Sequence, residues 1–538
     1  MNDFKDIDLN EAFLKALHLA EETDRNLFIT GRAGTGKSTF LNYFRANTKK
    51  EVAVLAPTGV AAVNVKGQTV HSFFGFKPDV TMHKIREIRP KNPHLYKKLD
   101  CIVIDEISMV RADILDCIDC FLRIHGKIKK KPFGGIQMIF IGDLYQLPPV
   151  VTSRERWIFK DFYKTPYFFD ARVFKECEFE FVELEKVYRQ SEIEFLEILN
   201  SIRNNTITDE IIEKLNTRVK PDFNLDEDAF YIYLTPTNKT AEEINSDKIS
   251  KIKNKEVKYY GYIDGEFTES DLPTSQELIL KVDAQVMLLN NDSKGRWING
   301  DIGKIVDIQT RKTESDIIVV ELTNGEVVEV TPFTWEMYEF YYDRAKKKIL
   351  TDVVGQFTQY PLKLAWAITI HKSQGLTFDR MILDIGKGTF SHGQLYVALS
   401  RCRSIDGLIL KKPVSKKHIL LDRRIVRFLT QFQYKYAEKT LPLEEKISII
   451  ENAINEGKEI EILYLKSTDI KSKRVLKPSY IGYMEYGDKK FLGLKAFCML
   501  RKQERHFNVE KILDVKVVNY TISISIDLSD FVQDGYPY

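Results

Sequence analysis

Short apolar runs alternate with amphipathic stretches along the first part of the chain. The runs NLFIT, VAVLAP, CIVIDE and MIFIGD each end at a polar or glycine-rich turn, and helical patterns separate them. Buried parallel strands appear as continuous apolar runs, because helices cover both faces of such a sheet. The pattern therefore predicts an α/β fold with its functional side chains at the carboxyl ends of the strands.

A second α/β pattern follows, with strands near YIYLTP and MILDIG. Short β-like runs with Asn-Gly and Lys-Gly turns interrupt it, and they predict a small inserted β-barrel at about residues 295–355. After Arg424 the α/β signal stops, and one helix leads into β-rich sequence. We expect a first lobe at 1–182, a second lobe at 183–435 and a C-terminal domain at 436–538.

Composition adds few constraints to this picture. The 538 residues are 43% hydrophobic and 29% charged, with a net charge of only +3, so any basic surface must be local. Six cysteines form no disulfide framework, and Cys117 and Cys120 fit an apolar helix better than a zinc site. Neither a leader nor a membrane-spanning run is visible. These features predict a soluble, monomeric protein of the reducing cytoplasm.

The most specific motif is GRAGTGKST, which follows the strand NLFIT and opens a helix. Glycines allow backbone N–H groups to close around phosphate oxygens at a helix N-terminus. In a P-loop of this kind the lysine reaches the β- and γ-phosphates and the following hydroxyl binds Mg²⁺. The expected nucleotide-binding residues are Gly31, Ala33, Gly34, Thr35, Gly36, Lys37, Ser38 and Thr39.

Two acidic residues stand side by side at the end of the strand CIVIDE. Asp105 is suited to binding Mg²⁺ together with Ser38, and Glu106 to activating the attacking water. Gln146, in GDLYQLPPV, is a neutral group that can contact the γ-phosphate. Adjacent acids at a strand end favour hydrolysis over transfer to a small acceptor, although a solvated acidic turn would have the same composition.

Two arginines complete the predicted site. Arg189 stands in VYRQ and Arg401 in YVALSRC, both in or beside the second α/β pattern. A guanidinium from the opposite lobe can neutralise charge on the γ-phosphate only when the lobes close, which couples hydrolysis to motion. A surface ion pair is the alternative role for either residue.

Taken together, the motifs resemble those of superfamily-one helicases, and more narrowly the Pif-type members of the RecD-like branch. The resemblance rests on LAPTGVAAVNVKGQTVHSFFGF, IDEISMV, GDLYQLPPV, VYRQ, LTPTNK, AWAITIHKSQGLTFD and YVALSRC, and on the closing PFGGIQ of the segment Arg111–Gln137. It covers about Asn10 to Asp422. It implies two RecA-like lobes, a small wedge within about 65–95, and an SH3-like character for the inserted barrel.

The same resemblance implies an ATP- and Mg²⁺-dependent motor moving 5′-to-3′ on single-stranded DNA and unwinding tailed duplexes. G-quadruplexes and RNA–DNA hybrids are possible substrates, and the family acts in DNA repair, replication and telomere maintenance. In a bacterium the protein would associate with the nucleoid. One departure concerns the first helix, where family members usually carry a glutamine that reads adenine. DLNEAFLKALHL has none in that place, so selectivity for ATP over other nucleotides is not implied.

A single-strand track needs phosphate donors and stacking surfaces for bases. The resemblance assigns such a role to strand-end and aromatic residues of both lobes, and it assigns Gln374 and Gly375 to communication with the nucleotide. The expected track residues are Thr58, Gly59, His71, Phe73, Phe76, Pro148, Thr235, Pro236, Thr237, Asn238, His371, Lys372 and Ser373. Core packing is the alternative for Phe73 and for its neighbour Phe74.

The C-terminal hundred residues resemble a WYL domain, a small Sm-like β-barrel associated with bacterial ligand sensing. The matching pieces are the strand ending at Tyr464, Arg474 followed by Pro478, and RHFNVEKI, whereas FLGL replaces the tripeptide that names the family. Ten Lys/Arg and four Asp/Glu lie between Asp469 and Arg505. Arg474, Lys495, Arg501 and Arg505 are therefore candidates for contacting single-stranded DNA. A solvated face on a structural barrel is the alternative.

Two other functional classes are open at this point. A nucleotide-switched DNA-binding regulator would suit a WYL domain, but no helix-turn-helix pattern is present. A P-loop phosphotransferase would explain GRAGTGKST but not HKSQG, ALSRC or LTPTNK. Measuring ATP hydrolysis with and without single-stranded DNA separates the three classes.

Overall fold

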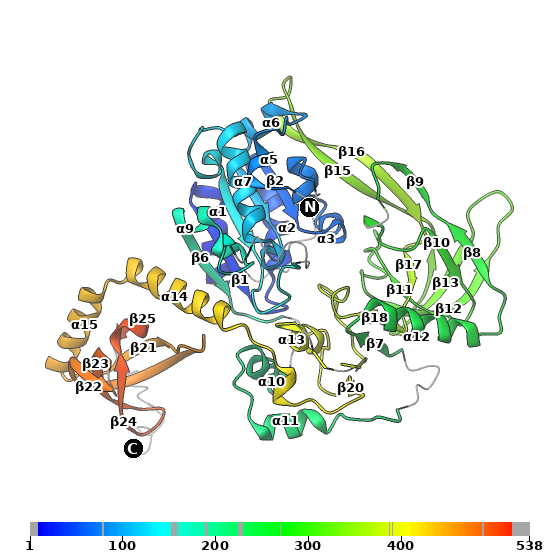
Figure 1. Cartoon of the computed structure of the whole chain (residues 1–538). Coiled ribbons are helices and arrows are strands. Elements are labelled where there is room, and N and C mark those ends of the chain that lie inside the picture. The colour runs from blue at the N-terminus through cyan, green and yellow to red at the C-terminus, as the bar shows by residue number, and fades with distance from the viewer. Residues whose placement is uncertain are drawn as a thin grey trace, which may run out of the picture. The chain divides into compact units, whose positions relative to one another are not determined.

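The computed structural model describes residues 9–518, except for 78–79, 152–158, 160, 189–191, 224–229, 269–270, 387, 390 and 487–488. The chain divides into two compact units, Met1–Asp422 and Arg423–Tyr538. The first unit contains two parallel sheets and a large β-rich insertion. Figure 1 shows its elements in chain order, from blue through green to yellow.

The first sheet is six-stranded and parallel, with the order β3-β2-β4-β5-β1-β6. Its strands are β1 (Asn26–Gly31), β2 (Val52–Ala56), β3 (Gln68–Thr69), β4 (Cys101–Ile104), β5 (Gln137–Ile141) and β6 (Phe179–Leu184). The predicted α/β architecture is confirmed. β6 pairs with β1 along its whole length, so this sheet ends at Leu184, two residues beyond the expected limit of 182.

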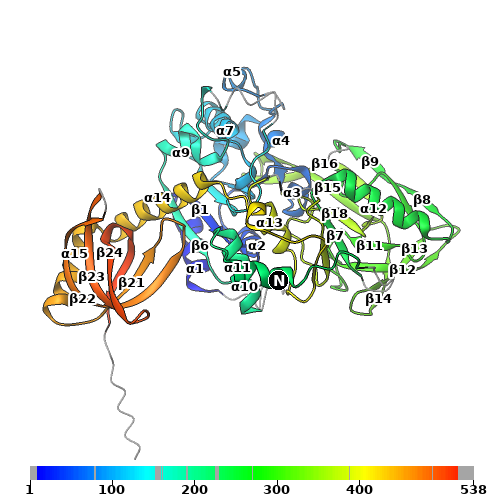
Figure 2. The ribbon, with the colours of Figure 1, turned by 60° about the horizontal axis from the view of Figure 1, so that its bottom comes forward.

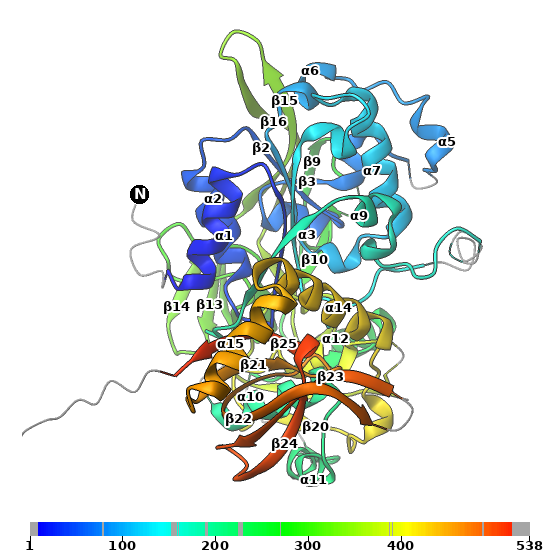
Figure 3. The ribbon, with the colours of Figure 1, turned by 90° about the vertical axis from the view of Figure 1, so that its left-hand side faces the viewer.

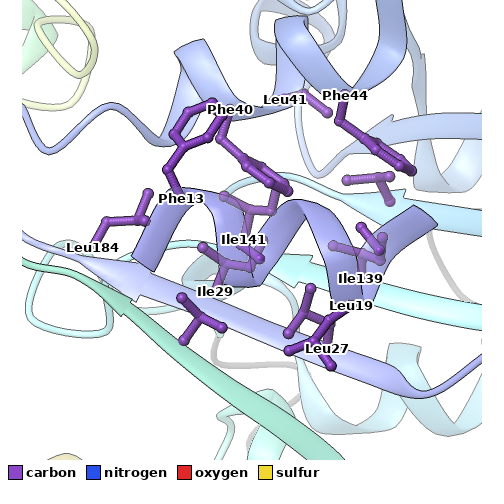
Figure 4. Packing of buried hydrophobic residues seen from close by; sticks show 14 of the residues in the cluster. Phe13, Leu19, Leu27, Ile29, Phe40, Leu41, Phe44, Ile139, Ile141 and Leu184 are labelled. Carbon is purple, nitrogen blue, oxygen red and sulfur yellow. The ribbon is translucent and has the colours of Figure 1, made fainter. Parts of the chain in front are cut away.

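Helices cover both faces of this sheet, which is why its strands are apolar throughout. On one face, α1 (Glu11–Glu22) and α2 (Lys37–Asn47) pack over Leu27 and Ile29 of β1 (Figure 4). Phe28 points to the other face and meets Phe168, on the side of α7 (Ala112–His125) and α9 (Arg172–Glu176). Figure 3 shows α1 and α2 on one side of the strands and α7 on the other.

The second sheet is four-stranded and parallel, with the order β18-β7-β19-β20. Its strands are β7 (Ile232–Thr235), β18 (Ala367–Thr369), β19 (Met381–Leu383) and β20 (Leu408–Leu410). The helices of this lobe are α10 (Ile193–Arg203), α11 (Asp209–Asn216), α12 (Asn238–Lys251) and α13 (Gln394–Leu399). Two parallel sheets in one unit agree with the two predicted lobes.

Between α12 and β18, all the regular elements of the described residues are strands, from Val257 to Leu364. It contains a five-stranded sheet in the order β14-β13-β12-β11-β17, a pair β10-β8, and a three-stranded sheet β15-β16-β9. The strands are β8 (Val257–Tyr260), β9 (Tyr262–Gly265), β10 (Glu277–Leu280), β11 (Gln285–Leu288), β12 (Ile302–Gln309), β13 (Ile317–Leu322), β14 (Val327–Val330), β15 (Phe333–Asp343), β16 (Lys348–Gln359) and β17 (Leu362–Leu364). The insertion thus extends beyond the expected 295–355 on both sides, and its SH3-like character stays a prediction.

β15 and β16 form a long hairpin that reaches the first lobe (Figure 1). The backbone N–H of Phe340 donates to Oε1 of Gln68 at 3.3 Å, and the ring of Phe340 packs edge-on against Phe73. The helices in and around the expected wedge are α3 (Gly59–Asn64), α4 (Val70–Phe74), α5 (Met82–Ile85) and α6 (Pro93–Lys98). The wedge region is therefore supported by an element that follows it by some 240 residues.

The second unit consists of α14 (Arg423–Thr440), α15 (Leu443–Asn455) and a five-stranded antiparallel sheet in the order β24-β23-β22-β21-β25 (Figure 2). Its strands are β21 (Ile460–Leu465), β22 (Lys471–Tyr486), β23 (Lys489–Cys498), β24 (Gln503–Asn508) and β25 (Ile512–Val517). Tyr434 of α14 donates to the carbonyl of Leu465 at 2.8 Å, so α14 belongs to this unit rather than to the second lobe. The unit begins at Arg423, before the expected 436. The Sm-like character of this sheet and the WYL assignment stay predictions.

None of the helices in the described part of the chain combines the length and apolar character needed to cross a membrane. Cys117 is buried in α7, and Cys120, one turn further along, is partly buried. Both are free thiols. Burial raises the pKa of each, as in ordinary core cysteines.

Candidate nucleotide site and nucleic-acid interface

The predicted P-loop connects β1 to α2. Gly34 and Gly36 have φ values of 78° and 86°, a left-handed conformation that glycine adopts without steric cost. A Cβ on Gly31 would lie 2.5 Å from the carbonyl oxygen of Leu184, so only glycine fits where β1 passes β6. The strand, the loop and the helix predicted around this motif are confirmed.

The side chains of the loop are arranged around its own backbone. Nζ of Lys37 donates to the carbonyl oxygens of Gly31 at 2.8 Å and Arg32 at 2.9 Å, and Oγ1 of Thr35 also donates to Arg32. Ser38 and Thr39 are exposed in the first turn of α2. The lysine therefore lies across the loop, within reach of an anion that enters from the helix N-terminus.

Asp105 and Glu106 follow β4 as predicted. Glu106 has a φ of 49°, a strained conformation for a residue with a side chain, and its Oε2 is buried without a hydrogen-bond partner among the described residues. Burial and the neighbouring Asp105 raise the pKa of Glu106, while Lys37 and Arg401 lower it. A strained, desolvated carboxylate is suited to accepting a proton from water.

The expected Mg²⁺ ligands, Ser38 and Asp105, offer a hydroxyl and a carboxylate oxygen, which are hard donors of the kind Mg²⁺ prefers. The described residues contain no cluster of three His, Cys, Asp or Glu that could hold a metal by itself. Mg²⁺ commonly binds one or two protein oxygens together with substrate phosphates. The residues present fit an ion that arrives with a nucleotide.

Gln146 lies buried beyond the end of β5. Its Nε2 is 3.4 Å from Oδ2 of Asp143, whose other oxygen forms an ion pair at 3.6 Å with Arg203 of α10. The guanidinium of Arg203 also lies over the ring of Tyr145, 3.9 Å from its centroid. Sequence reasoning missed Asp143 and Arg203, because nothing near Arg203 marks it as a partner of the GDLYQ motif.

α13 of the second lobe makes direct contact with the P-loop. The hydroxyl of Tyr396 accepts a hydrogen bond from the backbone N–H of Ala33 at 3.2 Å. Nε2 of His392 lies 3.1 Å from the carbonyl oxygen of Leu144, and a Cβ on Gly393 would lie 2.3 Å from that of Tyr145. The helix that precedes Arg401 is therefore held against the nucleotide loop and the GDLYQ motif at once.

Arg401 is 1% exposed. Its Nε donates to the carbonyl of Val397 at 2.9 Å and its Nη2 to Oγ of Ser400 at 2.9 Å. Nη1 reaches the carbonyls of Ser373 and Leu376 at 3.5 and 3.4 Å. The guanidinium thus bridges the ALSR and HKSQG motifs.

Three further predicted residues concern the nucleotide. Gln374 has a buried Nε2 that lacks a hydrogen-bond partner among the described residues, and Gly375 has a φ of 82° with open space where a Cβ would lie. Both features leave this loop able to accommodate a ligand or a change of conformation. Arg189 lies outside the described residues.

The predicted DNA-contacting residues include one equivalent pair in the two lobes. Thr58 follows β2 and caps α3, where its side chain accepts from the N–H of Ala61 at 3.3 Å. Thr237 follows β7 and caps α12 in the same way, accepting from Thr240 at 3.3 Å. Both threonines are exposed, and Gly59 and Asn238 open the two helices. Each lobe therefore presents a hydroxyl and backbone N–H groups at the end of a strand.

Four predicted DNA-contacting residues lie in the protein interior. Phe73 and Phe76 belong to an aromatic cluster around Phe74 and Tyr96, and they are 4% and 6% exposed. Their rings leave no face on which a base could stack, so core packing accounts for them. The hydroxyl of Ser373 donates to the carbonyl of Ile370, and that of Thr235 to the carbonyl of Thr237. Their hydrogen-bonding capacity is used within the fold.

His71 and Thr58 line a cavity of about 220 Å³ in the first lobe. The other residues around it are Pro57, Val70, Met109, Val110, Arg111, Ile114 and Val150. Burial and the charge of Arg111 lower the pKa of His71, which favours a neutral ring. Arg111 was missed because it stands just after the IDEISMV motif, and the exposed Val150, the last residue of GDLYQLPPV, because an apolar side chain carries no chemical signal of its own.

The second lobe contributes a partly buried His371, an exposed Lys372 and a partly buried Pro236, while Pro148 is partly buried in the first. Burial and the charge of Lys372 lower the pKa of Lys363, in β17, to about 8. Lys363 is a second cation beside the HKSQG motif that sequence reasoning did not identify.

Comparison with known proteins agrees with this arrangement. Residues 9–212 match the family model described as PIF1-like helicase. The ATP-dependent DNA helicase Pif1 of Bdellovibrio bacteriovorus is 34% identical over 440 residues, which cover 80% of this chain and 93% of the relative. The chain belongs to the Pif1-like helicase family.

Solved structures give the same result. Pif1 from Bacteroides sp in complex with ADP-AlF4 aligns with a TM-score of 0.71 and 38% identity, covering 81% of this chain and 98% of that one. Bacteroides Pif1 bound to ssDNA aligns with a TM-score of 0.57 and 38% identity, covering 82% and 98%. This Pif1-like helicase is an ATP-hydrolysing DNA helicase, and its relatives are named as such.

The C-terminal unit of this Pif1-like helicase shows only part of the expected basic surface. Arg474 is buried, since it shares one face of β22 with the core residue Leu476, and it contacts Ser472 and Cys498. This position rules it out as an exposed DNA contact. Lys495 pairs with Glu504 at 3.2 Å, whereas Arg501 and Arg505 are exposed. Tyr480 and Tyr483 are 53% and 80% exposed on β22, but Phe507 is in the core.

Proposed function

We propose that this Pif1-like helicase moves 5′-to-3′ along single-stranded DNA and unwinds tailed duplexes. The direction rests on the family resemblance, and the observation that carries the motor is the hydrogen bond between Tyr396 of α13 and Ala33 of the P-loop. It brings Arg401, five residues beyond Tyr396, to the same site as Lys37 and Glu106. A nucleotide bound there contacts both lobes, so its hydrolysis can change how they are held together.

In the proposed site each residue has a defined role. The P-loop backbone and Lys37 bind the phosphates, and Ser38 and Asp105 hold Mg²⁺, which neutralises phosphate charge when bound. Glu106 accepts a proton from the attacking water. Gln146 contacts the γ-phosphate and responds to its loss. Arg401, together with Arg189 by resemblance, stabilises the charge that develops on the γ-phosphate.

The proposed DNA track follows the strand-end pair Thr58 and Thr237. Gly59 and Asn238 add backbone N–H groups, and His71, Arg111 and Lys372 add a ring and positive charge. One relative is seen bound to ssDNA, which supports the same partner here. The protein moves along the strand if opening and closing of the lobes changes the distance between the groups at Thr58 and at Thr237 that bind DNA phosphates.

Unwinding of tailed duplexes tests the direction of movement. We expect strand separation when the duplex carries a 5′ single-stranded tail and none when it carries only a 3′ tail, because the motor loads on single strand and moves toward the junction. Gel-based or fluorescence unwinding with matched 5′-tailed, 3′-tailed and blunt duplexes measures this. Preferential unwinding from 3′ tails would reject the direction but not the motor.

We also propose that the C-terminal unit is an accessory binding site for single-stranded DNA. A chain ending at Asp422, where the first unit ends, is expected to hydrolyse ATP but to bind single strands more weakly. The slope of log K for single-strand binding against log salt concentration should become shallower by about 0.7 for each phosphate that the C-terminal unit would otherwise neutralise. Each base stacked on Tyr480 or Tyr483 contributes about 1–3 kcal/mol to binding. Single-strand binding between low and high salt measures both effects.

Point variants of the full chain locate this accessory binding site. Arg501→Ala with Arg505→Ala should reproduce part of the decrease in affinity, while the exposed pair Lys458→Ala with Lys466→Ala serves as a charge-matched control in the same unit. If the truncated chain keeps full affinity and an unchanged salt slope, the unit is a structural spacer or binds another ligand.

A further inference from the structure

Asp271 of the insertion lies directly against Gly59, one of the DNA-contacting residues proposed in the first lobe. A Cβ on Gly59 would overlap Oδ1 of Asp271 and would lie 3.0 Å from its Cγ, so the carboxylate comes this close only because the residue beneath it is glycine. Asp271 stands between β9 and β10, whereas Gly59 follows β2. The carboxylate therefore covers backbone that is proposed to contact a DNA phosphate.

Local contacts hold this carboxylate in place. The hydroxyl of Thr268 donates to Oδ2 of Asp271, and the backbone N–H of Asp271 donates to the carbonyl of Thr268 at 2.9 Å. The next residue, Leu272, packs against the same apolar cluster of the insertion as Val63 of α3. One oxygen of Asp271 is thus bound within its own turn, while the other faces the first lobe at Gly59.

The sequence around Asp271 is strongly acidic. Between Tyr259 and Leu280 it contains five Asp/Glu and no Lys/Arg. Oε1 of Glu266, in this stretch, forms an ion pair at 3.7 Å with Lys91, which lies within the predicted wedge. Contacts to phosphates supply much of the affinity of a protein for nucleic acid, so acidic side chains beside a DNA track oppose binding. The insertion therefore brings negative charge against the first lobe at the proposed track.

We propose that Asp271 takes the place of a DNA phosphate at Gly59 when no DNA is bound, so that single-stranded DNA must displace it to bind the first lobe. The inference rests on the proposed track and adds a regulation of that track. A carboxylate and a phosphate carry charge of the same sign and need the same space beside the glycine backbone, so they exclude each other. The apparent affinity for DNA is then reduced to the fraction of molecules in which Asp271 has left Gly59.

Removal of the acid tests this competition in the full chain. Asp271→Asn removes the charge at nearly constant shape, and Asp271→Ala removes both charge and bulk. We expect each variant to bind a fluorescein-labelled oligothymidylate at least about fivefold more tightly than the parent chain, the lower end of the range for coupling between two sites. Asp264→Asn is the matched control, because Asp264 is exposed on β9 and the net charge changes equally. It should bind with the parental affinity.

Binding rates separate occupation of the free protein from repulsion within the DNA complex. Because Asp271 has already left Gly59 once DNA is bound, Asp271→Asn should raise the association rate constant and leave the dissociation rate constant at the parental value. Stopped-flow fluorescence with the same oligothymidylate measures both constants. Slower dissociation with unchanged association would mean that Asp271 repels DNA inside the complex, and this result would overturn the proposal.

DNA-stimulated ATP hydrolysis gives a further readout. The DNA concentration that gives half-maximal stimulation should fall in Asp271→Asn, whereas turnover at saturating DNA should stay parental, because the displaced residue no longer affects the complex. Parental affinity in both Asp271 variants, or an equal gain in Asp264→Asn, would overturn the inference and leave the proposed track intact. If neither the parent chain nor Asp271→Ala binds single strands, the proposed track itself fails, and the inference fails with it.

Discussion

Arg401→Ala is expected to lower DNA-stimulated ATP hydrolysis by about 10³–10⁵-fold, the contribution found for arginines that stabilise a transferring phosphoryl group. Arg401 is buried and donates to carbonyls of both the ALSR helix and the HKSQG loop. It also lowers the pKa of Glu106, so its charge reaches the reacting centre. Steady-state hydrolysis with saturating single-stranded DNA measures the decrease, and nucleotide affinity should change far less.

Because Arg401 is buried, loss of activity must be separated from loss of fold. Arg401→Lys keeps a charge but cannot span the same carbonyls, and we expect it to remain folded with strongly reduced turnover. Arg403→Ala is the matched control: this arginine is 59% exposed and pairs with Asp379 at 2.8 Å. It should retain near-parental turnover. Parental hydrolysis by a folded Arg401 variant would remove Arg401 from the site.

Glu106→Gln is the second large effect. The change keeps shape but removes the proton acceptor, and general-base catalysis is worth about 10²–10⁴-fold in rate. Nucleotide binding should persist, whereas Lys37→Ala should lose it together with activity, because Lys37 is the residue proposed to bind the phosphates. Hydrolysis rates and nucleotide titrations of the two variants, compared with the exposed Glu210→Gln as control, measure the difference.

Stability provides an independent check on the same residue. Burial raises the pKa of Glu106, so its ionised form destabilises the fold at neutral pH, and Oε2 lacks a hydrogen-bond partner among the described residues. A neutral amide removes that charge, and we expect Glu106→Gln to melt at or above the temperature of the parent chain. A variant that is inactive and markedly less stable would instead indicate a structural role for Glu106.

Local sequence was sufficient for the nucleotide-binding elements. The P-loop, the acidic pair and the strand before each are contiguous segments, and parallel strands bring their carboxyl ends to one edge of a sheet. The glycines of GRAGTGKST have the positive φ values that such a loop requires. The order of the motifs was likewise enough to indicate the family, since each motif is defined by neighbouring residues.

Side-chain burial in the track was decided only by the tertiary structure. Phe73 and Phe76 lie in a motif expected to contact DNA. The β15–β16 hairpin and α6 close over Phe73, and Phe76 packs against Phe74 and Phe121 of α7, so both rings lie in the core. An apolar residue in a short motif has the same local pattern whether it faces solvent or core. Arg474 is a related case, because the register of β22 turns it inward beside Leu476.

The side-chain contacts between the two lobes could not be predicted from the sequence. Asp143 pairs with Arg203 across 60 positions, and Ala33 donates to Tyr396 across 363. Such contacts depend on how two separately folded sheets pack, and no periodicity or local motif records that packing. The sequence by itself determined the two α/β lobes, the nucleotide chemistry and the family. The tertiary structure decided which side chains reach across the lobes, which remain exposed, and that the C-terminal unit begins at Arg423, because those depend on long-range packing.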